Sequence, residues 1–276
     1  MPEGPEIRRA ADRIARVLVD RTVIDVELTL PSLRRYQNRL RGRRVTAIET
    51  HGKAMLSRFD NGLTLYSHNQ LYGRWYVVRR PARPDTNREL RVALHTSSHS
   101  ALLYSASDIE VLTERQLERH PFLSKLGPDI LDASLTRAVI VERLRNPRFC
   151  NRAFGALYLD QSFLAGLGNY LRSEILWAAR VHPRLRPADV DERVLGRVAD
   201  RTLTISRRSY RSGGLTVTRA LARRLEADGW RFGERRFYVF GREGEPCHEC
   251  GRNIDRDTLG SRNIFQCATC QPPDVH

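Results

Sequence analysis

Four of the five cysteines stand in two pairs whose spacing is typical of metal ligands. Each pair reads Cys-x-x-Cys, and sixteen residues separate the pairs: Cys247 and Cys250, then Cys267 and Cys270. Two such pairs match a tetrahedral four-thiolate zinc site on a β-hairpin, a zinc ribbon. Because four thiolates fill the coordination shell, we expect one structural zinc ion and no role for His248 as a ligand. The loop held by the metal would carry Arg256 and Arg262.

A glycine-rich turn lies between two helical patterns in FLAGLGNYLRSEIL, residues 163–176. Gly166 and Gly168 interrupt the periodicity, and Asn169 opens the next helical run. Backbone N–H groups are free at a helix N-terminus, and such a place binds phosphate. An ordinary helical hairpin is an equally weighted interpretation of this stretch alone.

The segment HNQLYG places a polar, an aliphatic and an aromatic residue on an expected loop. Gln70, Leu71 and Tyr72 stand between a predicted strand and Gly73. This composition suits a wedge that unstacks bases and fills the resulting gap. Taken alone, the triplet also fits the edge of a hairpin.

The charge of the chain indicates a polyanionic partner. The formal net charge is +15 and the pI is about 10.4, which favours nucleic acid over an anionic membrane surface because no basic amphipathic segment stands apart. Of the 47 basic residues only Lys53 and Lys125 are lysines. Since Arg stays protonated and Lys can lose its proton, each Lys is a candidate for chemistry.

The sequence also predicts where the protein works. The first apolar stretch, residues 7–19, is interrupted by charges and is neither a signal peptide nor a transmembrane segment. Five cysteines in such a chain indicate metal ligands or free thiols rather than disulfides. We therefore expect a cytoplasmic protein with no membrane association.

Periodicity predicts two kinds of domain. Residues 7–18 have helical spacing, residues 24–30 alternate like a half-buried strand, and Asp60-Asn61-Gly62 is a hairpin signal. The β pattern continues to about Ser105, which favours a sandwich or barrel, and a helical pattern follows. The predicted class is multidomain α+β. Its parts are a β-rich domain with an N-terminal helix (1–120), a linker (121–131), a helical domain (132–235) and a zinc ribbon (236–270).

Taken together, these motifs resemble the formamidopyrimidine-DNA glycosylase/endonuclease VIII family along nearly the whole chain. The resemblance rests on PEGPE at the N-terminus, HGK around Lys53, DQSFLAGLGNYLRSEIL and the four cysteines. YSHNQLYGRW is similar to the endonuclease VIII branch in particular. The resemblance implies an N-terminal β-sandwich and a helix-two-turn-helix motif in the helical domain. It also implies damaged double-stranded DNA as the partner of a monomeric, nucleoid-associated enzyme.

The resemblance also assigns chemistry to four residues. Pro2 becomes the nucleophile once Met1 is removed, because its secondary amine attacks C1′ of the damaged nucleoside and forms an iminium. Glu3 is the acid of the glycosylase step and Lys53 the acid of β-elimination. Arg262 grips the lesion phosphates and is assigned to δ-elimination.

Further residues match positions of the family that contact DNA. Gln70, Leu71 and Tyr72 match the wedge, and Asn169 and Lys125 match polar and basic contact positions. Residues 213–233 (GGLTVTRALARRLEADGWRFG) depart from the endonuclease VIII pattern, and their start resembles the loop with which the purine-directed branch covers its base.

The resemblance therefore predicts a bifunctional DNA glycosylase/abasic-site lyase of base excision repair. It would remove oxidised pyrimidines through a Schiff base on Pro2 and nick the strand by β,δ-elimination. One alternative is the same chemistry on oxidised purines such as formamidopyrimidine or 8-oxoguanine. The other is a zinc-ribbon protein that binds DNA without catalysis.

Overall fold

The computed structural model describes residues 2–273, and the chain divides into two compact units. Unit 1 ends at Lys125 and unit 2 begins at Leu126, a point that lies inside the segment predicted as a linker.

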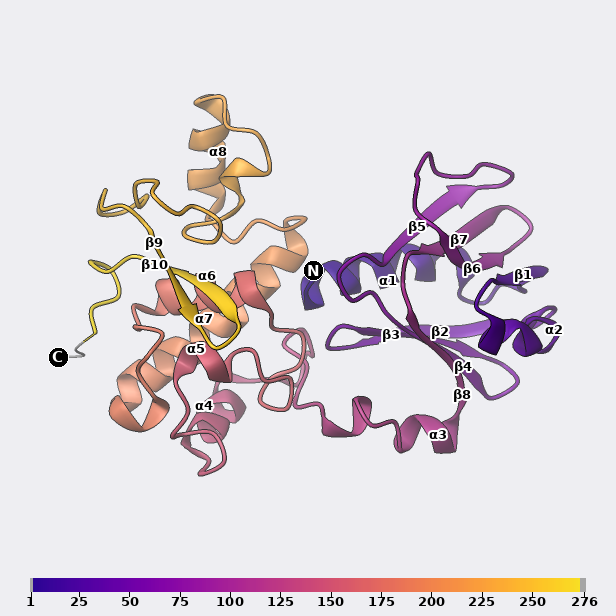
Figure 1. Cartoon of the computed structure of the whole chain (residues 1–276), viewed down its shortest axis with the longest axis horizontal. Coiled ribbons are helices and arrows are strands. Elements are labelled where there is room, and N and C mark those ends of the chain that lie inside the picture. Colours follow the sequence, from indigo (N-terminus) through magenta and orange to yellow (C-terminus); the bar gives the residue numbers. More distant parts are fainter. Residues whose placement is uncertain (1, 274–276) are drawn as a thin grey trace. The chain divides into compact units, whose positions relative to one another are not determined.

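Unit 1 is a sandwich of two four-stranded antiparallel sheets (Figure 1). One sheet has the order β1-β6-β7-β5 and the other β2-β3-β4-β8. Apolar residues of both sheets fill the core between them. The strands are β1 (Asp25–Leu28), β2 (Val45–His51), β3 (Ala54–Phe59), β4 (Leu63–His68), β5 (Arg74–Arg79), β6 (Leu90–His95), β7 (His99–Tyr104) and β8 (Asp108–Thr113).

Helix α1 (Gly4–Leu18) supplies the third side of this core. Its apolar face, which includes Ile7, Ile14 and Leu18, is buried, and the helix packs against strands of both sheets. The N-terminus of the helix is fixed by a capping box in which the Glu3 side chain accepts the Glu6 N–H and the Glu6 carboxylate accepts the Glu3 N–H at 3.1 Å. The first residues of the chain are therefore held by helix capping.

The predicted hairpin at Asp60-Asn61-Gly62 joins β3 to β4. Gly62 has φ +75°, a conformation that glycine adopts without strain. Register along this hairpin pairs Ala54 with His68, so the start of β3 lies beside the end of β4. Short elements complete the unit: η1 (Pro31–Tyr36), α2 (Gln37–Leu40), α3 (Glu114–Glu118) and η2 (Leu123–Lys125).

Unit 2 is helical and ends in a two-stranded hairpin (Figure 1). Its core is built mainly from α4, α6 and α7, and Ile264 of the hairpin contributes to it. The elements are α4 (Arg137–Arg145), α5 (Phe154–Leu157), α6 (Asn169–Ala179), η3 (Pro187–Asp189), α7 (Glu192–Arg211), α8 (Arg219–Ala227), η4 (Glu234–Arg236), β9 (Asp255–Leu259) and β10 (Arg262–Gln266). The predicted α+β class with a β-sandwich and a helical domain is confirmed.

The segment that departs from the endonuclease VIII pattern contains a regular helix. Thr218 caps α8 by accepting the Leu221 N–H at 3.3 Å, and Ala222 and Leu225 bury the apolar face of the helix. None of the helices within residues 2–273 combines the length and apolar character needed to span a bilayer.

Candidate active site and metal centre

Pro2 lines a cavity of about 250 Å³ in unit 1. The first turns of α1 form one wall, and the loop between β4 and β5 forms another through Leu71 and Tyr72. Three cationic side chains and one acidic side chain also line it, which leaves the lining with a positive balance: Arg13, Arg74, Arg88 and Glu6. A concave site with positive walls concentrates anionic ligands. The cavity thus brings the predicted nucleophile and two predicted wedge residues together.

Glu3 is buried, with 2% of its surface exposed. Its carboxylate accepts a backbone N–H at the N-terminus of α1, where the helix dipole favours negative charge. The side chain next to Pro2 therefore has a structural contact as well as the chemical role that the resemblance implies.

Lys53 lies in the turn between β2 and β3, directly after Gly52, which has φ +62°. Since the next residue, Ala54, pairs with His68, Lys53 is close to the start of the wedge loop. The electrostatics agree with this placement. Burial lowers the pKa of His68, the Lys53 charge lowers it further, and Asp108 acts in the opposite direction.

Gln70, Leu71 and Tyr72, the predicted wedge residues, are exposed at the tip of the loop between β4 and β5. Leu71 and Tyr72 have 58% and 69% of their surface exposed, although large apolar side chains usually lie inside. Gln70 adopts φ +49°, which is uncommon for a residue other than glycine. An exposed apolar pair on a strained loop fits insertion into another molecule.

Two residues outside the triplet hold this loop, and no sequence pattern indicated either of them. Ser107 Oγ donates to Gln70 Oε1 at 2.8 Å, and the Arg88 guanidinium donates to the Tyr72 carbonyl oxygen. Gly73 permits the turn, because a Cβ there would lie 2.5 Å from the Asn69 carbonyl oxygen. These contacts hold the loop between β4 and β5 in one conformation.

In unit 2, Asn169 is the first residue of α6 and follows the Gly166–Gly168 turn, as predicted. Gln161 stabilises this turn, since its amide donates to the Leu167 carbonyl at 2.9 Å and accepts the Gly166 N–H at 3.1 Å. The Asn169 side-chain oxygen accepts a hydrogen bond from Arg172 at 2.7 Å. Because the buried Arg172 binds the side-chain oxygen, it fixes the orientation of the Asn169 amide NH₂ group.

Arg172 is a buried residue beside Asn169 that no sequence motif indicated. It is fully buried and donates to the Gly155 carbonyl (2.8 Å), to Asn169 Oδ1 (2.7 Å) and to the Asn263 carbonyl (2.8 Å). Asn263 follows Arg262 in β10, so one guanidinium joins the start of α6 to the hairpin tip. No local pattern distinguishes Arg172 among the 47 basic residues.

Arg262 is exposed at the first position of β10. It pairs with Leu259 across the Gly260-Ser261 turn, where Gly260 has φ +67°. Arg256, on the same hairpin, forms an ion pair with Glu243 at 3.1 Å. Lys125 is exposed at the end of η2 in unit 1.

The four cysteines of the predicted ribbon meet at the base of the hairpin. All four Sγ atoms lie within 4.8 Å of one another, with 3.9 Å between Cys247 and Cys270 and 3.4 Å between Cys250 and Cys267. A tetrahedral zinc with Zn–S bonds of about 2.3 Å places its sulfurs about 3.8 Å apart. Sulfur atoms in a disulfide lie about 2.05 Å apart, so these thiols are unbonded and fit a metal.

The surroundings of the thiols and of the neighbouring histidine differ. The Arg252 backbone N–H lowers the pKa of Cys250 to about 7, whereas burial raises the pKa of Cys267 and Cys270. Burial also lowers the pKa of His248 to about 4. Within residues 2–273 the cluster consists of the four cysteines and does not include His248.

Glu174 is a second buried charged residue that the sequence did not identify. Its carboxylate accepts the Thr216 hydroxyl and the backbone N–H groups of Tyr238, Val239 and Phe240, the last three at 2.8–2.9 Å. Burial raises the pKa of Glu174, and these hydrogen bonds oppose that effect. The three backbone N–H groups can only donate to the carboxylate, whereas the Thr216 hydroxyl also lies 2.9 Å from the Arg236 carbonyl oxygen and has one proton for the two acceptors.

Solved structures of DNA-bound proteins share this fold. The chain superposes on Lactococcus lactis Fpg bound to DNA containing N7-benzyl-Fapy-dG with a TM-score of 0.81 and 21% identity, over 98% of this chain and 100% of the other. It also matches the same protein bound to abasic-site DNA, with a TM-score of 0.79. Two family models match the sequence: the formamidopyrimidine-DNA glycosylase N-terminal domain (residues 1–109) and the formamidopyrimidine-DNA glycosylase H2TH domain (residues 126–220). The fold is that of an Fpg-type DNA glycosylase.

Sequence identity to curated relatives identifies the family of the chain. Proteins called Endonuclease 8 from Escherichia coli and Shigella sonnei are 50% identical to this chain over 271 residues, which is 98% of this chain and 100% of theirs. The chain belongs to the formamidopyrimidine-DNA glycosylase/endonuclease VIII family, as predicted from its motifs. It is a DNA glycosylase and abasic-site lyase of base excision repair.

Proposed function

We propose that this enzyme removes oxidised pyrimidines from double-stranded DNA through a Schiff base on Pro2. The observation that carries the proposal is the cavity in which Pro2 meets Leu71 and Tyr72. A wedge that displaces a base next to an amine nucleophile is the arrangement that base extrusion and attack at C1′ require. The 50% identity to proteins named Endonuclease 8 supports the pyrimidine assignment.

The residues then divide the reaction among them. The secondary amine of Pro2, with a reference pKa of about 7.7–8.0, is partly neutral near neutral pH and attacks C1′. Glu3 supplies the proton of the glycosylase step, and Lys53 that of β-elimination. Arg262 grips the phosphates and serves δ-elimination, while Asn169 and Lys125 contact the DNA backbone.

The unmodified N-terminus is the first thing to test. Removal of Met1, which lies outside the described residues, exposes the amine. Borohydride should trap a covalent protein–DNA adduct, and an N-terminal tag should abolish trapping. A C-terminal tag is the matched control and should leave trapping intact. Equal trapping by both tagged proteins would exclude Pro2 as the nucleophile.

Glu3 requires a variant that separates helix capping from proton transfer. Glu3→Gln keeps an acceptor for the α1 backbone N–H and removes the titratable proton. We expect it to lose base excision while still cleaving a preformed abasic site. Loss of both activities at unchanged stability would contradict this division of roles.

The proposed roles of Lys53 and Arg262 can be distinguished by the reaction products of their variants. Lys53→Ala should slow elimination after the Schiff base has formed. Arg262→Ala should weaken lesion binding and lower its salt dependence, because each phosphate contact releases a counterion. Unaltered binding, salt slope and products in Arg262→Ala would remove the hairpin tip from the mechanism.

A purine-directed specificity is the second candidate. It is favoured by residues 213–233, whose start resembles the cover of the purine branch. The wedge triplet matches the pyrimidine branch residue by residue, so we give it more weight. Single-turnover excision should be faster for thymine glycol or dihydrouracil than for 8-oxoguanine opposite cytosine, and the reverse order would establish the purine assignment.

We further propose that the cluster of Cys247, Cys250, Cys267 and Cys270 holds one structural zinc ion, which orders the hairpin that carries Arg262. The enzyme would act as a monomer on damaged double-stranded DNA in the cytoplasm, associated with the nucleoid. Size-exclusion chromatography with light scattering tests the monomer. The wild-type protein should elute at the 31.8 kDa mass of one chain.

A further inference from the structure

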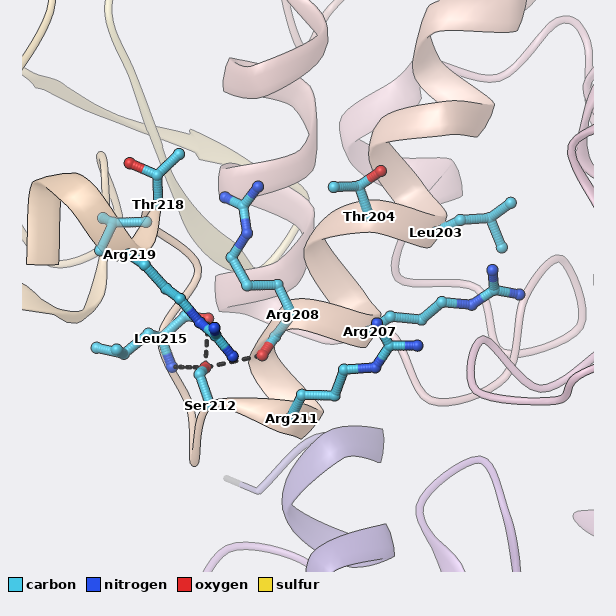
Figure 2. Close-up of a pocket in the computed structure, with 10 residues that line it drawn as sticks. Leu203, Thr204, Arg207, Arg208, Arg211, Ser212, Leu215, Thr218 and Arg219 are labelled. Carbon is cyan, nitrogen blue, oxygen red and sulfur yellow. Dashed lines mark hydrogen bonds between the residues drawn. The ribbon is translucent and has the colours of Figure 1, made fainter.

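A second cavity, of about 550 Å³, lies in unit 2 between the C-terminal part of α7 and the loop that leads into α8 (Figure 2). Four arginines line it, together with an apolar wall. The arginines are Arg207, Arg208, Arg211 and Arg219, and the apolar residues are Leu203, Leu215 and Val217.

The positive charge of this cavity has no counter-charge from the protein. No lining residue is acidic, and within residues 2–273 none of the four guanidinium groups forms an ion pair with a carboxylate. Arg208 donates to the Thr216 carbonyl at 2.7 Å and Arg207 to the Leu135 carbonyl at 3.1 Å. Arg211 and Arg219 are exposed and donate to no described group. Like charges gathered in this way repel one another until an anion binds.

The wall of the cavity is fixed by hydrogen bonds rather than left as a loose loop. Ser212 Oγ donates to the Arg208 carbonyl at 2.7 Å and accepts the Leu215 N–H at 3.0 Å (Figure 2). Farther along, the Thr216 N–H donates to the Arg236 carbonyl at 2.9 Å and the Thr218 N–H to the Tyr238 hydroxyl at 3.1 Å. The site therefore exists before a ligand arrives.

The lining indicates the ligand. The planar guanidinium group of arginine matches phosphate oxygens, and bidentate contacts make it the preferred residue for phosphate recognition. A volume of about 550 Å³ is too large for a lone phosphate and lies within the usual range of small-molecule sites, about 300–1,000 Å³. The apolar side chains suit the carbon atoms of a sugar.

We propose that this cavity binds a phosphodiester of the DNA strand together with its attached sugar. The inference rests on the proposed function, because DNA is the substrate of that enzyme. Arg211 and Arg219 would make the phosphate contacts, and Arg208 would hold the wall through Thr216.

The test uses a duplex with a tetrahydrofuran abasic analogue, which the enzyme binds without cleaving. Arg211→Gln, Arg219→Gln and the double variant are compared with Arg193→Gln. Arg193 is exposed and lies on the same helix, 18 residues before Arg211. At a helical rise of about 1.5 Å per residue, the two positions are about 27 Å apart. Each single cavity variant should bind about tenfold more weakly at 0.15 M salt and lower the slope of log K against log salt by about 0.9, and the double variant should lower the slope by about twice as much. Arg193→Gln should match wild type.

Three outcomes would overturn the proposal. Unaltered slopes in the cavity variants would show that no phosphate is bound there. Binding of inorganic phosphate that protects wild type but not the variants against heat, with unaltered DNA affinity, would identify a free anion as the ligand. An effect seen only with DNA that retains its damaged base would assign the cavity to the base. Because the analogue is not cleaved, failure of borohydride trapping by wild type would refute the Pro2 chemistry and leave this measurement intact.

Discussion

Replacing Arg172 by methionine removes the guanidinium that connects the start of α6 to the hairpin tip. Methionine keeps most of the apolar stem and donates no hydrogen bond. The change removes the donor of three acceptors: the buried carbonyl oxygen of Gly155 and the partly buried Asn263 carbonyl and Asn169 side-chain oxygens.

The size of the effect follows from these contacts. A hydrogen bond from a charged donor contributes about 1.5–3 kcal/mol, and three such bonds are lost. Removing a buried cation also relieves its desolvation, which offsets part of the loss. We expect the free energy of unfolding of unit 2 to fall by about 3–5 kcal/mol, the range seen when a buried charged network is broken.

Urea unfolding of the zinc-loaded protein measures this change. In a Trp75→Phe background the tryptophan fluorescence comes only from Trp177 and Trp230, both in unit 2. The matched control is Arg197→Met, because Arg197 is half-buried and makes one hydrogen bond, to the Ala179 carbonyl at 2.6 Å. That control loses one hydrogen bond from a charged donor, so its free energy of unfolding should fall by about 1.5 kcal/mol, the low end of the range, because Arg197 is half-buried.

The same variant has a functional readout. Since Arg172 orients Asn169 and supports the strand that carries Arg262, Arg172→Met should weaken binding of the tetrahydrofuran duplex about tenfold, equivalent to about 1.4 kcal/mol. A loss of stability no larger than that of Arg197→Met, with unchanged DNA affinity, would refute the assignment of Arg172 as the connection between the two elements.

Three further predictions follow. Glu174→Gln should destabilise unit 2 by about 1–3 kcal/mol in urea unfolding, because the new NH₂ group faces donors where the carboxylate accepted them; a stability equal to wild type would mean that Glu174 is protonated. Unit 1 should lose stability as the pH falls below about 6.5, because His68 has a lowered pKa in the folded state and takes up a proton more readily when unfolded. His68→Gln should flatten the slope of unfolding free energy against pH. An unchanged slope would show that His68 does not cause the pH dependence. Metal analysis should find about one zinc per chain, and Cys267→Ser should lose the metal and DNA cleavage while unit 1 stays folded; full cleavage without metal would exclude the ribbon from the mechanism.

The sequence alone determined those features that depend on neighbours along the chain. The spacing of the four cysteines predicted their convergence, and the apolar periodicity of residues 7–18 predicted α1. The Asp60-Asn61-Gly62 turn predicted the hairpin of β3 and β4. Residues 213–233 are an exception, because their departure from the family pattern gave no expectation for their structure. The structure shows that this segment contains α8, which Thr218 caps and whose residues Ala222 and Leu225 are buried.

Tertiary structure decided which distant groups share a site. Arg172 reaches Asn263 across 91 positions, and Glu174 reaches Thr216 across 42. Ser107 holds Gln70 across 37 positions. None of these pairings can be inferred from periodicity or turn motifs, because the hydrogen-bond partner of a buried polar residue is distant in the sequence. In the same way, the meeting of Pro2 with the wedge loop depends on α1 packing across both sheets, since packing alone brings that turn of helix to that loop.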